Sequence, residues 1–441
     1  MKKFSYIDAT EYLDKCLVFG IKPGLERIMK ILNILGEPHK KTDFIHIVGS
    51  NGKTSTATMT AAILCGQGFR GAYHISPHIS EYTERFWLCG SNISKKRFAS
   101  LFSSIFPVIE EVNNLDKGGN ATQFEIISAM AFLLAAEEHL DVMVLEAGMG
   151  GRWDATNVAD SKIVGLTGVS LEHTAILGKT IKEIAIEKAE VIKPRAKVAT
   201  TGVGEPVLSI LKDKTEKTGS RLYIFGKDFN IVKMEKRYLK GWNVDIKGIY
   251  DIYNGLFIPI LGNYQPYNLS LALALSELYL EDSGSKINHD SLRKSLSVIK
   301  VAGRFEILGK RPIVIADASH NPEGIQNLVK NISENFEGRK KLVIFSVLKD
   351  KDYVKMLGGI MEISDTIILT SSNTSRSLPI EILKKELYKL LRTKEEVKHR
   401  APVKIYTIDT IANSLNFALK ISDSNDMICI TGSITNLEDI V

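Results

Sequence analysis

The sequence has few cysteines and no long apolar run. Its four cysteines, at Cys16, Cys65, Cys89 and Cys429, form no CxxC pair and have no regular spacing. We therefore expect reduced thiols rather than a metal cluster or a disulfide framework. No run of about 18 apolar residues occurs, so no membrane span is expected. The N-terminal segment MKKFSYIDATEYLDK lacks the apolar core of a signal peptide. These absences together predict a cytoplasmic protein.

The sequence also lacks a block of like charges. The net charge of +6 is spread over 441 residues, with no basic arm and no interleaved aromatics. Nucleic-acid binding is therefore not expected. A mild positive balance still favours anionic substrates such as nucleotides. Hydrophobic residues make up 44% and charged residues 24%, which is ordinary for a globular protein.

Short β-branched runs alternate with longer helical patterns along the chain. This alternation predicts an α/β fold with parallel sheets, and the length predicts two domains. We place them at residues 1–298 and 299–441. The predicted strands are 44–48, 141–145 and 163–166 in the first domain, and 312–316, 341–347, 365–370, 403–406 and 427–430 in the second. Residues 222–258 are predicted to form a β-rich segment between them.

A short glycine loop follows the first predicted strand. In IHIVGSNGKTST, two glycines free the backbone to wrap an oxyanion, and Lys53 can reach the phosphates of a nucleotide. The Thr54 hydroxyl can bind Mg²⁺. The generic pattern GxxxxGK[ST] is not met, because its first glycine would fall at Ile47. The sequence still predicts a phosphate-binding loop, formed by Gly49, Ser50, Asn51, Gly52, Lys53 and Thr54.

Two polar residues follow other predicted strands. Glu146 ends the strand at 141–145, where a carboxylate beside a nucleotide is placed to bind Mg²⁺. It could instead cap the amides of the glycine loop that follows. His173 lies after the strand at 163–166, and a lone histidine at such a position is more often a hydrogen-bonded loop residue than a metal ligand.

Many further blocks occur in a fixed order. They are HISPHISEYTERF, TQFEIISAMAF, LEAGMGGRWDATN, SLEHTAILGKTIKEIAIEKAEVIK, GNYQPYN, GRFEI, DASHNPEG, VLKDKD and ITGS. Together with the short phosphate loop they resemble the folylpolyglutamate synthase and dihydrofolate synthase family of the Mur ligase superfamily. The resemblance covers nearly the whole chain. It implies an N-terminal P-loop ATPase domain with a parallel sheet and a smaller Rossmann-like α/β domain at the C-terminus.

The resemblance implies an ATP-dependent amide ligase that joins L-glutamate to a folate or dihydropteroate carboxylate through an acyl phosphate. Two Mg²⁺ ions are implied, with ligands Thr54, Ser76, Glu146, His173 and Lys188, the last converted to a carbamate by CO₂. The implied catalytic residues are Lys53, Lys188 and His320, and the further nucleotide contacts are Asn268, Arg304 and Asp317. The implied substrate pocket comprises Thr122, Gln123, Phe124, Glu125, Trp153, Asp154 and Ala155. A monomer whose two domains close over the substrates is also implied.

Several of these residues have plainer interpretations. Lys188 lies among glutamates on a predicted helix and could form only surface ion pairs. Phe124 and Trp153 could be core residues, and Asn268 a helix cap. Ser76 could be a turn serine before a proline, and Arg304 a partner in a salt bridge.

The chain departs from the family pattern at several positions. Glu172 replaces the usual Asp, Glu190 a Gly, Tyr264 a His, Ser319 a Gly, Thr54 a Gly, and Trp153 a smaller residue. Two alternatives therefore stay open. One is a related ligase that joins an amino acid to a different carboxylate, and the other is a nucleotide-binding regulator without ligase activity.

Overall fold

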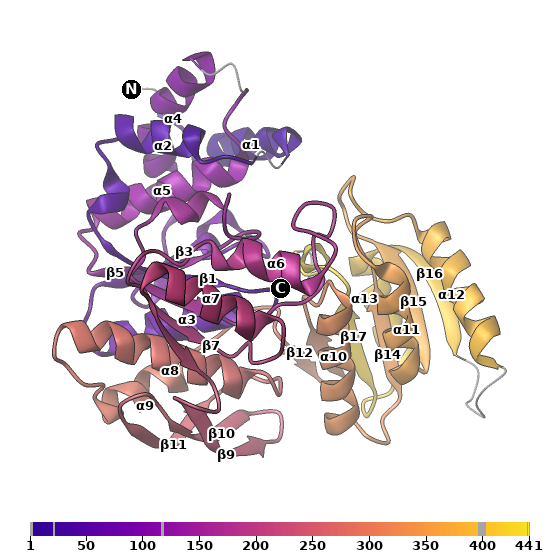
Figure 1. Cartoon of the computed structure of the whole chain (residues 1–441). Coiled ribbons are helices and arrows are strands. Elements are labelled where there is room, and N and C mark those ends of the chain that lie inside the picture. Colours follow the sequence, from indigo (N-terminus) through magenta and orange to yellow (C-terminus); the bar gives the residue numbers. More distant parts are fainter. Residues whose placement is uncertain (1–2, 21–22, 116–118, 396–402, 439, 441) are drawn as a thin grey trace. The chain divides into compact units, whose positions relative to one another are not determined.

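The computed structural model describes residues 3–20, 23–115, 119–395, 403–438 and 440 (Figure 1). The chain divides into two compact units. The N-terminal unit comprises residues 1–235, 243–258 and 266–299, and the C-terminal unit comprises 236–242, 259–265 and 300–441. The sequence did not predict that two short segments before residue 299, 236–242 and 259–265, belong to the C-terminal unit. The domain division at 298/299 itself stays a prediction.

The N-terminal unit is built on one sheet of eight strands. Their order is β4-β3-β2-β5-β1-β6-β7-β8. The strands are β1 (Asp43–Val48), β2 (Gly71–His74), β3 (Phe86–Leu88), β4 (Ser91–Asn92), β5 (Val142–Glu146), β6 (Ile163–Leu166), β7 (Lys197–Thr200) and β8 (Arg221–Ile224). Only the β2–β3 and β3–β4 pairs are antiparallel. The carboxyl ends of β1, β5 and β6 therefore meet at one edge, where ligands of such sheets bind.

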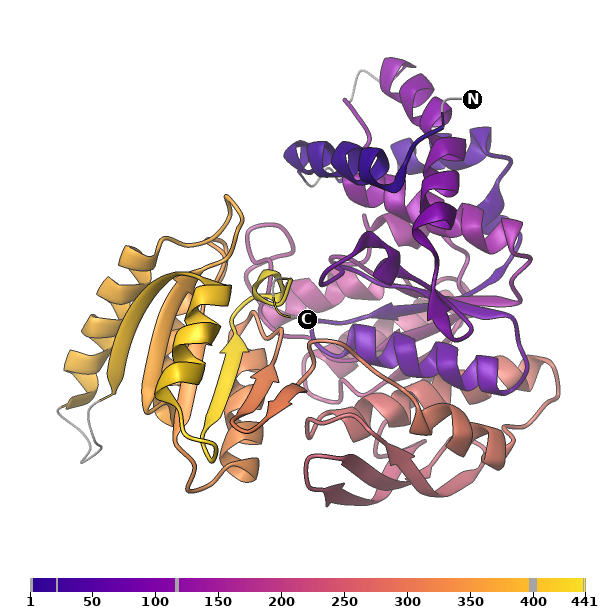
Figure 2. The ribbon, with the colours of Figure 1, turned by 180° about the vertical axis from the view of Figure 1, so that it is seen from behind.

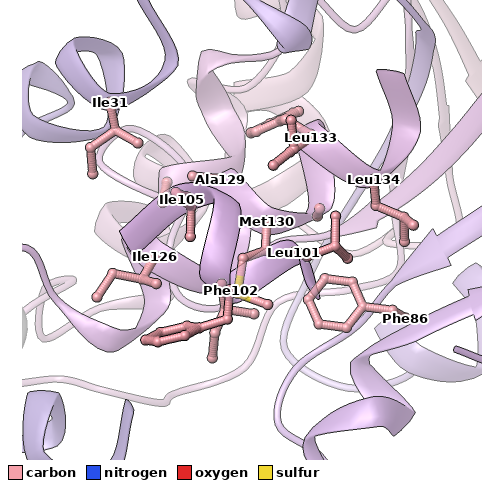
Figure 3. Packing of buried hydrophobic residues seen from close by; sticks show 14 of the residues in the cluster. Ile31, Phe86, Leu101, Phe102, Ile105, Ile126, Ala129, Met130, Leu133 and Leu134 are labelled. Carbon is pink, nitrogen blue, oxygen red and sulfur yellow. The ribbon is translucent and has the colours of Figure 1, made fainter. Parts of the chain in front are cut away.

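Helices cover both faces of this sheet. In both views α1 (Tyr6–Lys15), α2 (Glu26–Ile34), α4 (Lys95–Leu115) and α5 (Gln123–Glu137) lie together on one side (Figures 1 and 2). Helix α5 is apolar almost all round, so it is buried on nearly every side (Figure 3). Helices α6 (Ile181–Ala189) and α7 (Val207–Thr218) pack together beside β6 and β7. Among the described helices, none is long and apolar enough to cross a membrane.

The other face of the sheet carries α3 (Lys53–Gly66), α8 (Gln265–Asp282) and α9 (His289–Ser297). Helix α8 approaches β6 closely, because a Cβ at Gly165 would lie 2.7 Å from Leu275 Cδ1. Glycine at this position lets the helix that carries Asn268 pack directly onto the sheet.

The predicted β-rich segment contains a three-stranded sheet, ordered β11-β10-β9. Its strands are β9 (Asn230–Arg237), β10 (Gly241–Lys247) and β11 (Ile252–Ile258). The turn before β11 is fixed by Glu277 of α8, which is 4% exposed. Its carboxylate accepts the amides of Ile249, Tyr250 and Asp251 at 2.6, 3.2 and 3.1 Å and the hydroxyl of Tyr253 at 2.9 Å. One buried carboxylate thus anchors this turn to the helix.

The C-terminal unit is a second α/β sheet, ordered β12-β13-β17-β14-β15-β16. Its strands are β12 (Glu306–Lys310), β13 (Ile313–Ala316), β14 (Lys341–Phe345), β15 (Thr366–Ser371), β16 (Lys404–Thr410) and β17 (Met427–Thr431). Its helices are α10 (Pro322–Asn335), α11 (Tyr353–Ile363), α12 (Ile380–Glu395) and α13 (Ile411–Ile421). All strand pairs except β12–β13 are parallel. The predicted fold class, α/β with two parallel-dominated sheets, is confirmed.

Two of the four cysteines form a disulfide, so the expectation of reduced thiols throughout is wrong. Cys65 lies in the last turn of α3 and Cys89 follows β3, with a sequence separation of 24. They meet because α3 leads into β2, and β3 returns antiparallel beside β2. Such a pairing depends on tertiary topology and has no signature in cysteine spacing. Cys16 and Cys429 are free and buried.

Candidate active site

The predicted phosphate loop connects β1 to α3. Gly49 and Gly52 have φ angles of 145° and 89°, which favour glycine. A Cβ at Gly49 would collide with the Thr167 hydroxyl, and one at Gly52 would lie 2.5 Å from Asn268 Oδ1. Gly52 is the N-cap of α3, so the first amides of that helix open toward the loop. This arrangement suits an anion at a helix N-terminus.

Two polar side chains of the loop, those of Lys53 and Thr54, form hydrogen bonds at the carboxyl edge of the sheet. Lys53 Nζ donates to the carbonyls of Gly49 and Ser50 at 3.0 and 3.1 Å. The Thr54 hydroxyl donates to Glu146, with oxygen separations of 3.1 and 3.0 Å. The ammonium therefore lies against the loop that is predicted to hold phosphates, and Glu146 lies beside the threonine.

Glu146 also receives the Ser76 amide at 3.3 Å. The Ser76 hydroxyl is buried and has no hydrogen-bond partner. Mg²⁺ prefers oxygen ligands such as hydroxyl and carboxylate groups. A buried hydroxyl without a hydrogen-bond partner needs one, and a metal ion could supply it. Thr54, Ser76 and Glu146 therefore fit Mg²⁺. Among the described residues no group of three or more His, Cys, Asp or Glu side chains could hold a metal, so phosphate oxygens and water would have to complete the site.

Lys188 on α6 is buried beside the same loop. Its Nζ donates to the Gly49 carbonyl at 2.8 Å and to Glu172 Oε1 at 2.8 Å. The side chains of Lys188 and Glu172 are only 2% and 7% exposed. Burial lowers the pKa of Lys188, while the neighbouring Lys188 and Lys53 lower the pKa of Glu172 to about 2 against the effect of its own burial. The alternative interpretation of Lys188, which gave it only surface ion pairs, is wrong.

Asn268 and His173 complete the predicted residues of this unit. Asn268 is 6% exposed and lies against Gly52, as its nearness to a Cβ there indicates. His173 follows Glu172 in a turn and has a φ of 46°. Its carbonyl accepts the amides of Ile176 and Leu177 at 2.9 and 3.0 Å. Its predicted role as a metal ligand stays a prediction.

The predicted substrate residues at the start of α5 are largely engaged with the protein. Thr122 and Glu125 form a capping box. Glu125 also pairs with Arg27 at 3.1 Å, both side chains being nearly buried. Gln123 donates to the Leu13 carbonyl and the Tyr82 hydroxyl at 3.3 and 2.6 Å. These contacts position the helix, and substrate binding by the three residues stays a prediction.

Phe124 differs from its neighbours, because its ring lies against the glycine loop after β5. A Cβ at Gly148 would be 2.7 Å from Phe124 Cζ. Farther along this loop Trp153 is 51% exposed, whereas Asp154 and Ala155 are each 4% exposed. Phe124 and Trp153 are therefore the two predicted pocket residues with aromatic surface at or near this loop.

A network of four polar side chains beside the loop of Ser76 was not identified from the sequence. Arg85 is 6% exposed, and its Nε donates to His78 Nδ1 at 2.7 Å. Burial lowers the pKa of His78 to about 3, so the ring is neutral and accepts. The His78 ring packs against Tyr82, whose hydroxyl donates to Asp14 at 2.5 Å. The block HISPHISEYTERF contains three of these four residues, but only the fold brings Asp14 of α1 to them.

The predicted C-terminal residues are grouped within their own unit. Asp317 is 3% exposed and accepts the amides of Phe305 and Ser319 at 2.9 and 3.0 Å. The carboxylate thus fixes the turn that carries Arg304. His320 Nδ1 donates to the Ala318 carbonyl at 3.0 Å. Nε2 is therefore the ring nitrogen that could gain or lose a proton in a reaction. Their roles toward ATP and the reaction stay predictions.

Comparisons with known proteins agree with this architecture. The Mur ligase middle domain matches residues 47–276, and the Mur ligase glutamate ligase domain matches residues 303–434. The dihydrofolate synthase/folylpolyglutamate synthase of Bacillus subtilis (strain 168) is 30% identical over 437 residues, covering 99% of this chain and 98% of its own.

Solved structures give the same result. Folylpolyglutamate synthase of Mycobacterium tuberculosis, complexed with ADP and AMPPCP, has a TM-score of 0.89 at 27% identity, with 98% of each chain covered. The Thermotoga maritima folylpolyglutamate synthase has a TM-score of 0.82 at 30% identity, covering 98% of this chain and 95% of its own. The chain belongs to the Mur ligase family, and the predicted family and its ligase class are confirmed.

Proposed function

We propose that this chain is an ATP-dependent ligase that joins L-glutamate to the carboxylate of a folate or dihydropteroate. The observation that carries the proposal is the cluster of Lys53, Thr54, Glu146 and Lys188 around the Gly49 loop, in a chain whose full-length relatives bear these synthase names. The complexes of one relative with ADP and AMPPCP support ATP as the nucleotide.

The proposed reaction has two steps. A substrate carboxylate oxygen attacks the γ-phosphorus of ATP, forming an O–P bond while the bond to the β–γ bridging oxygen breaks and ADP leaves. The amine of glutamate then attacks the acyl carbon, a tetrahedral intermediate forms, phosphate leaves and the amine loses a proton. Lys53 and the first amides of α3 offset charge on the phosphoryl group throughout.

Thr54, Ser76 and Glu146 would hold Mg²⁺, which when bound neutralises phosphate charge. The chain's own contribution is to keep these oxygens together before ATP arrives. Glu146 accepts hydrogen bonds from the Thr54 hydroxyl and the Ser76 amide, so the three residues already meet at the edge of the sheet. In the C-terminal unit, Arg304 and Asp317 are the proposed nucleotide contacts and His320 the proposed catalytic group.

We also propose the carbamate at Lys188, because its pKa is lowered and only a neutral amine can add to CO₂, releasing one proton. Intact-mass measurement in bicarbonate buffer that contains Mg²⁺ should show the added mass of one CO₂, and this increase should be absent in Lys188→Met. A mass that never exceeds that of the unmodified chain contradicts this part of the proposal. A monomer in the cytoplasm is proposed as well, to be checked by light scattering and cell fractionation.

A substrate panel tests the function. The purified chain is incubated with ATP, Mg²⁺, L-glutamate and one acid per reaction. The acids are dihydropteroate, tetrahydrofolate and a monoglutamylated folate. Phosphate release and a product one glutamate heavier are expected with at least one of them. Phosphate release with none, but with another carboxylic acid, identifies the related ligase. ATP binding with no amide product from any acid identifies the regulator.

Lys53→Ala is the matched control for this panel. Because Lys53 is at the surface of its loop and bonds only loop carbonyls, its loss should leave the fold intact. Turnover should fall by at least about 10²-fold, as for other lost groups that offset transition-state charge. Normal turnover of a folded Lys53→Ala variant contradicts the assignment of this loop.

A further inference from the structure

A buried chain of hydrogen bonds joins β1 to the glycine loop that follows β5. His46 on β1 is fully buried, and its Nε2 lies 2.8 Å from the Thr156 hydroxyl. That hydroxyl makes a short contact with Asp154 Oδ1, and the Thr156 amide donates to the same oxygen at 3.0 Å. The other oxygen, Asp154 Oδ2, accepts the Met149 amide at 2.9 Å.

The protons in this chain follow from its chemistry. Asp154 faces three donors, which is the environment of an ionised, acceptor-only carboxylate. The single proton of Thr156 therefore points to Asp154, and the Thr156 oxygen accepts from His46. His46 must then carry its proton on Nε2, which agrees with Nδ1 being buried without a partner, since an unpartnered lone pair costs less than an unpartnered N–H. Burial keeps the ring neutral.

The loop that Asp154 holds lies between two parts of the proposed site. On one side Gly148 packs against the ring of Phe124, and His74 stacks on that ring at 6.2 Å between centroids. On the other side the loop begins just after Glu146. Glu146 is held separately by Thr54 and Ser76, so a shift of Gly148 and Met149 need not move it.

We propose that His46 and Thr156 are positioning residues that act through Asp154 on the Gly148–Met149 loop, and so set the enzyme's affinity for the flat heterocycle of its carboxylate substrate. The inference rests on the proposed function. It adds that recognition of the heterocycle depends on the buried hydrogen-bond chain His46–Thr156–Asp154. This chain begins on β1, the strand that leads into the phosphate loop. His46 and Thr156 touch neither substrate themselves.

The Thr156 pair of variants tests this role. Thr156→Val removes the hydroxyl at nearly constant volume, whereas Thr156→Ser keeps it. KM for the pterin or folate substrate should rise about tenfold or more in Thr156→Val, the effect of losing a hydrogen bond to a charged group. KM for ATP should stay close to the wild-type value, because Lys53 and Thr54 are held in place by Gly49, Ser50 and Glu146. Thr156→Ser should restore the wild-type value.

His46 offers a second, independent pair. His46→Phe removes the donor and His46→Gln supplies a side-chain N–H in its place, so the KM defect should appear in the first and be smaller in the second. If all four variants have the wild-type KM for both the heterocyclic substrate and ATP, the proposal is overturned. So does a loss of kcat that tracks a loss of folded protein without a change in the KM ratio, because that result marks a purely structural role. Wild-type activity on the panel is measured first, so a failure of the proposed function is seen separately.

Discussion

Breaking the buried pair between Lys188 and Glu172 should destabilise the N-terminal unit strongly. In Glu172→Gln the ammonium of Lys188 keeps its position at 2.8 Å from the Gly49 carbonyl but loses its counter-charge. With exposures of 2% and 7%, water cannot replace the lost partner. Removing one member of such a pair costs about 3–5 kcal/mol of unfolding free energy.

The same helix provides a matched control. Glu187, on α6 with Lys188, pairs with Arg152 at 3.0 Å, but that arginine is 38% exposed. Glu187→Gln should therefore cost about 0.5 kcal/mol or less. Guanidinium denaturation followed by circular dichroism gives both values. A surface pair contributes at most about 1 kcal/mol. If Glu172→Gln and Glu187→Gln lower the unfolding free energy by amounts that differ by less than this, that result refutes the argument. The double variant Lys188→Met/Glu172→Leu should recover most of the stability.

Three further changes should be measurable. Cys65→Ser should lower the unfolding free energy by about 3 kcal/mol in oxidising buffer, because the Cys65–Cys89 disulfide closes a loop with a sequence separation of 24. With a reductant the decrease should be much smaller. An equal decrease in both buffers would contradict the presence of the disulfide. His46 and His74, whose pKa values burial lowers to about 3, stay neutral in the fold but take up protons below pH ~6.5 when unfolded. Stability should therefore fall from pH ~6.5 toward ~3, by about 1.4 kcal/mol per pH unit for each group, and His46→Phe should reduce that slope measured by denaturation. Glu277→Ala should cost about 3 kcal/mol, because three part-buried amides and the buried Tyr253 hydroxyl lose the carboxylate that accepts from them. A melting temperature equal to that of the wild type would refute this.

Part of each sheet was predictable, because buried parallel strands leave continuous apolar runs. The run before Gly49 and the five runs of the C-terminal unit each correspond to a strand. The phosphate loop was predictable too, since its glycines, lysine and threonine are adjacent in the chain. No strand was predicted at β2, β3, β4, β7 or β12; β3 and β4, with three and two residues, are too short for a periodic pattern.

The contacts made by the site residues were less predictable than their identities. Glu125 was predicted to bind substrate, yet it pairs with Arg27, which lies 98 residues away in the sequence. The plainer interpretation paired Lys188 with the glutamates near it on its own helix, but its partner is Glu172, which precedes that helix. Sequence patterns report neighbours within one element, whereas the partners of buried charges are brought in by other elements.

The Glu172–Lys188 pair also bears on the proposed carbamate. As paired, the lysine is a cation that donates to an anion and to a carbonyl. A carbamate at the same atom is an anion, so Glu172 would face a like charge. At a separation of 4 Å and an effective dielectric constant of 20, that repulsion is about 4 kcal/mol, enough to prevent the modification unless another positive charge is present. A divalent cation is such a charge, and the carbamate is one of the ligands that it would need. We therefore expect the modification of Lys188 to depend on Mg²⁺, and the expected mass increase to disappear when the metal is chelated. A carbamate that persists in chelator would mean that Glu172 moves away from Lys188, and the substitution of Glu for the family's usual Asp would then serve to lengthen the side chain for that movement.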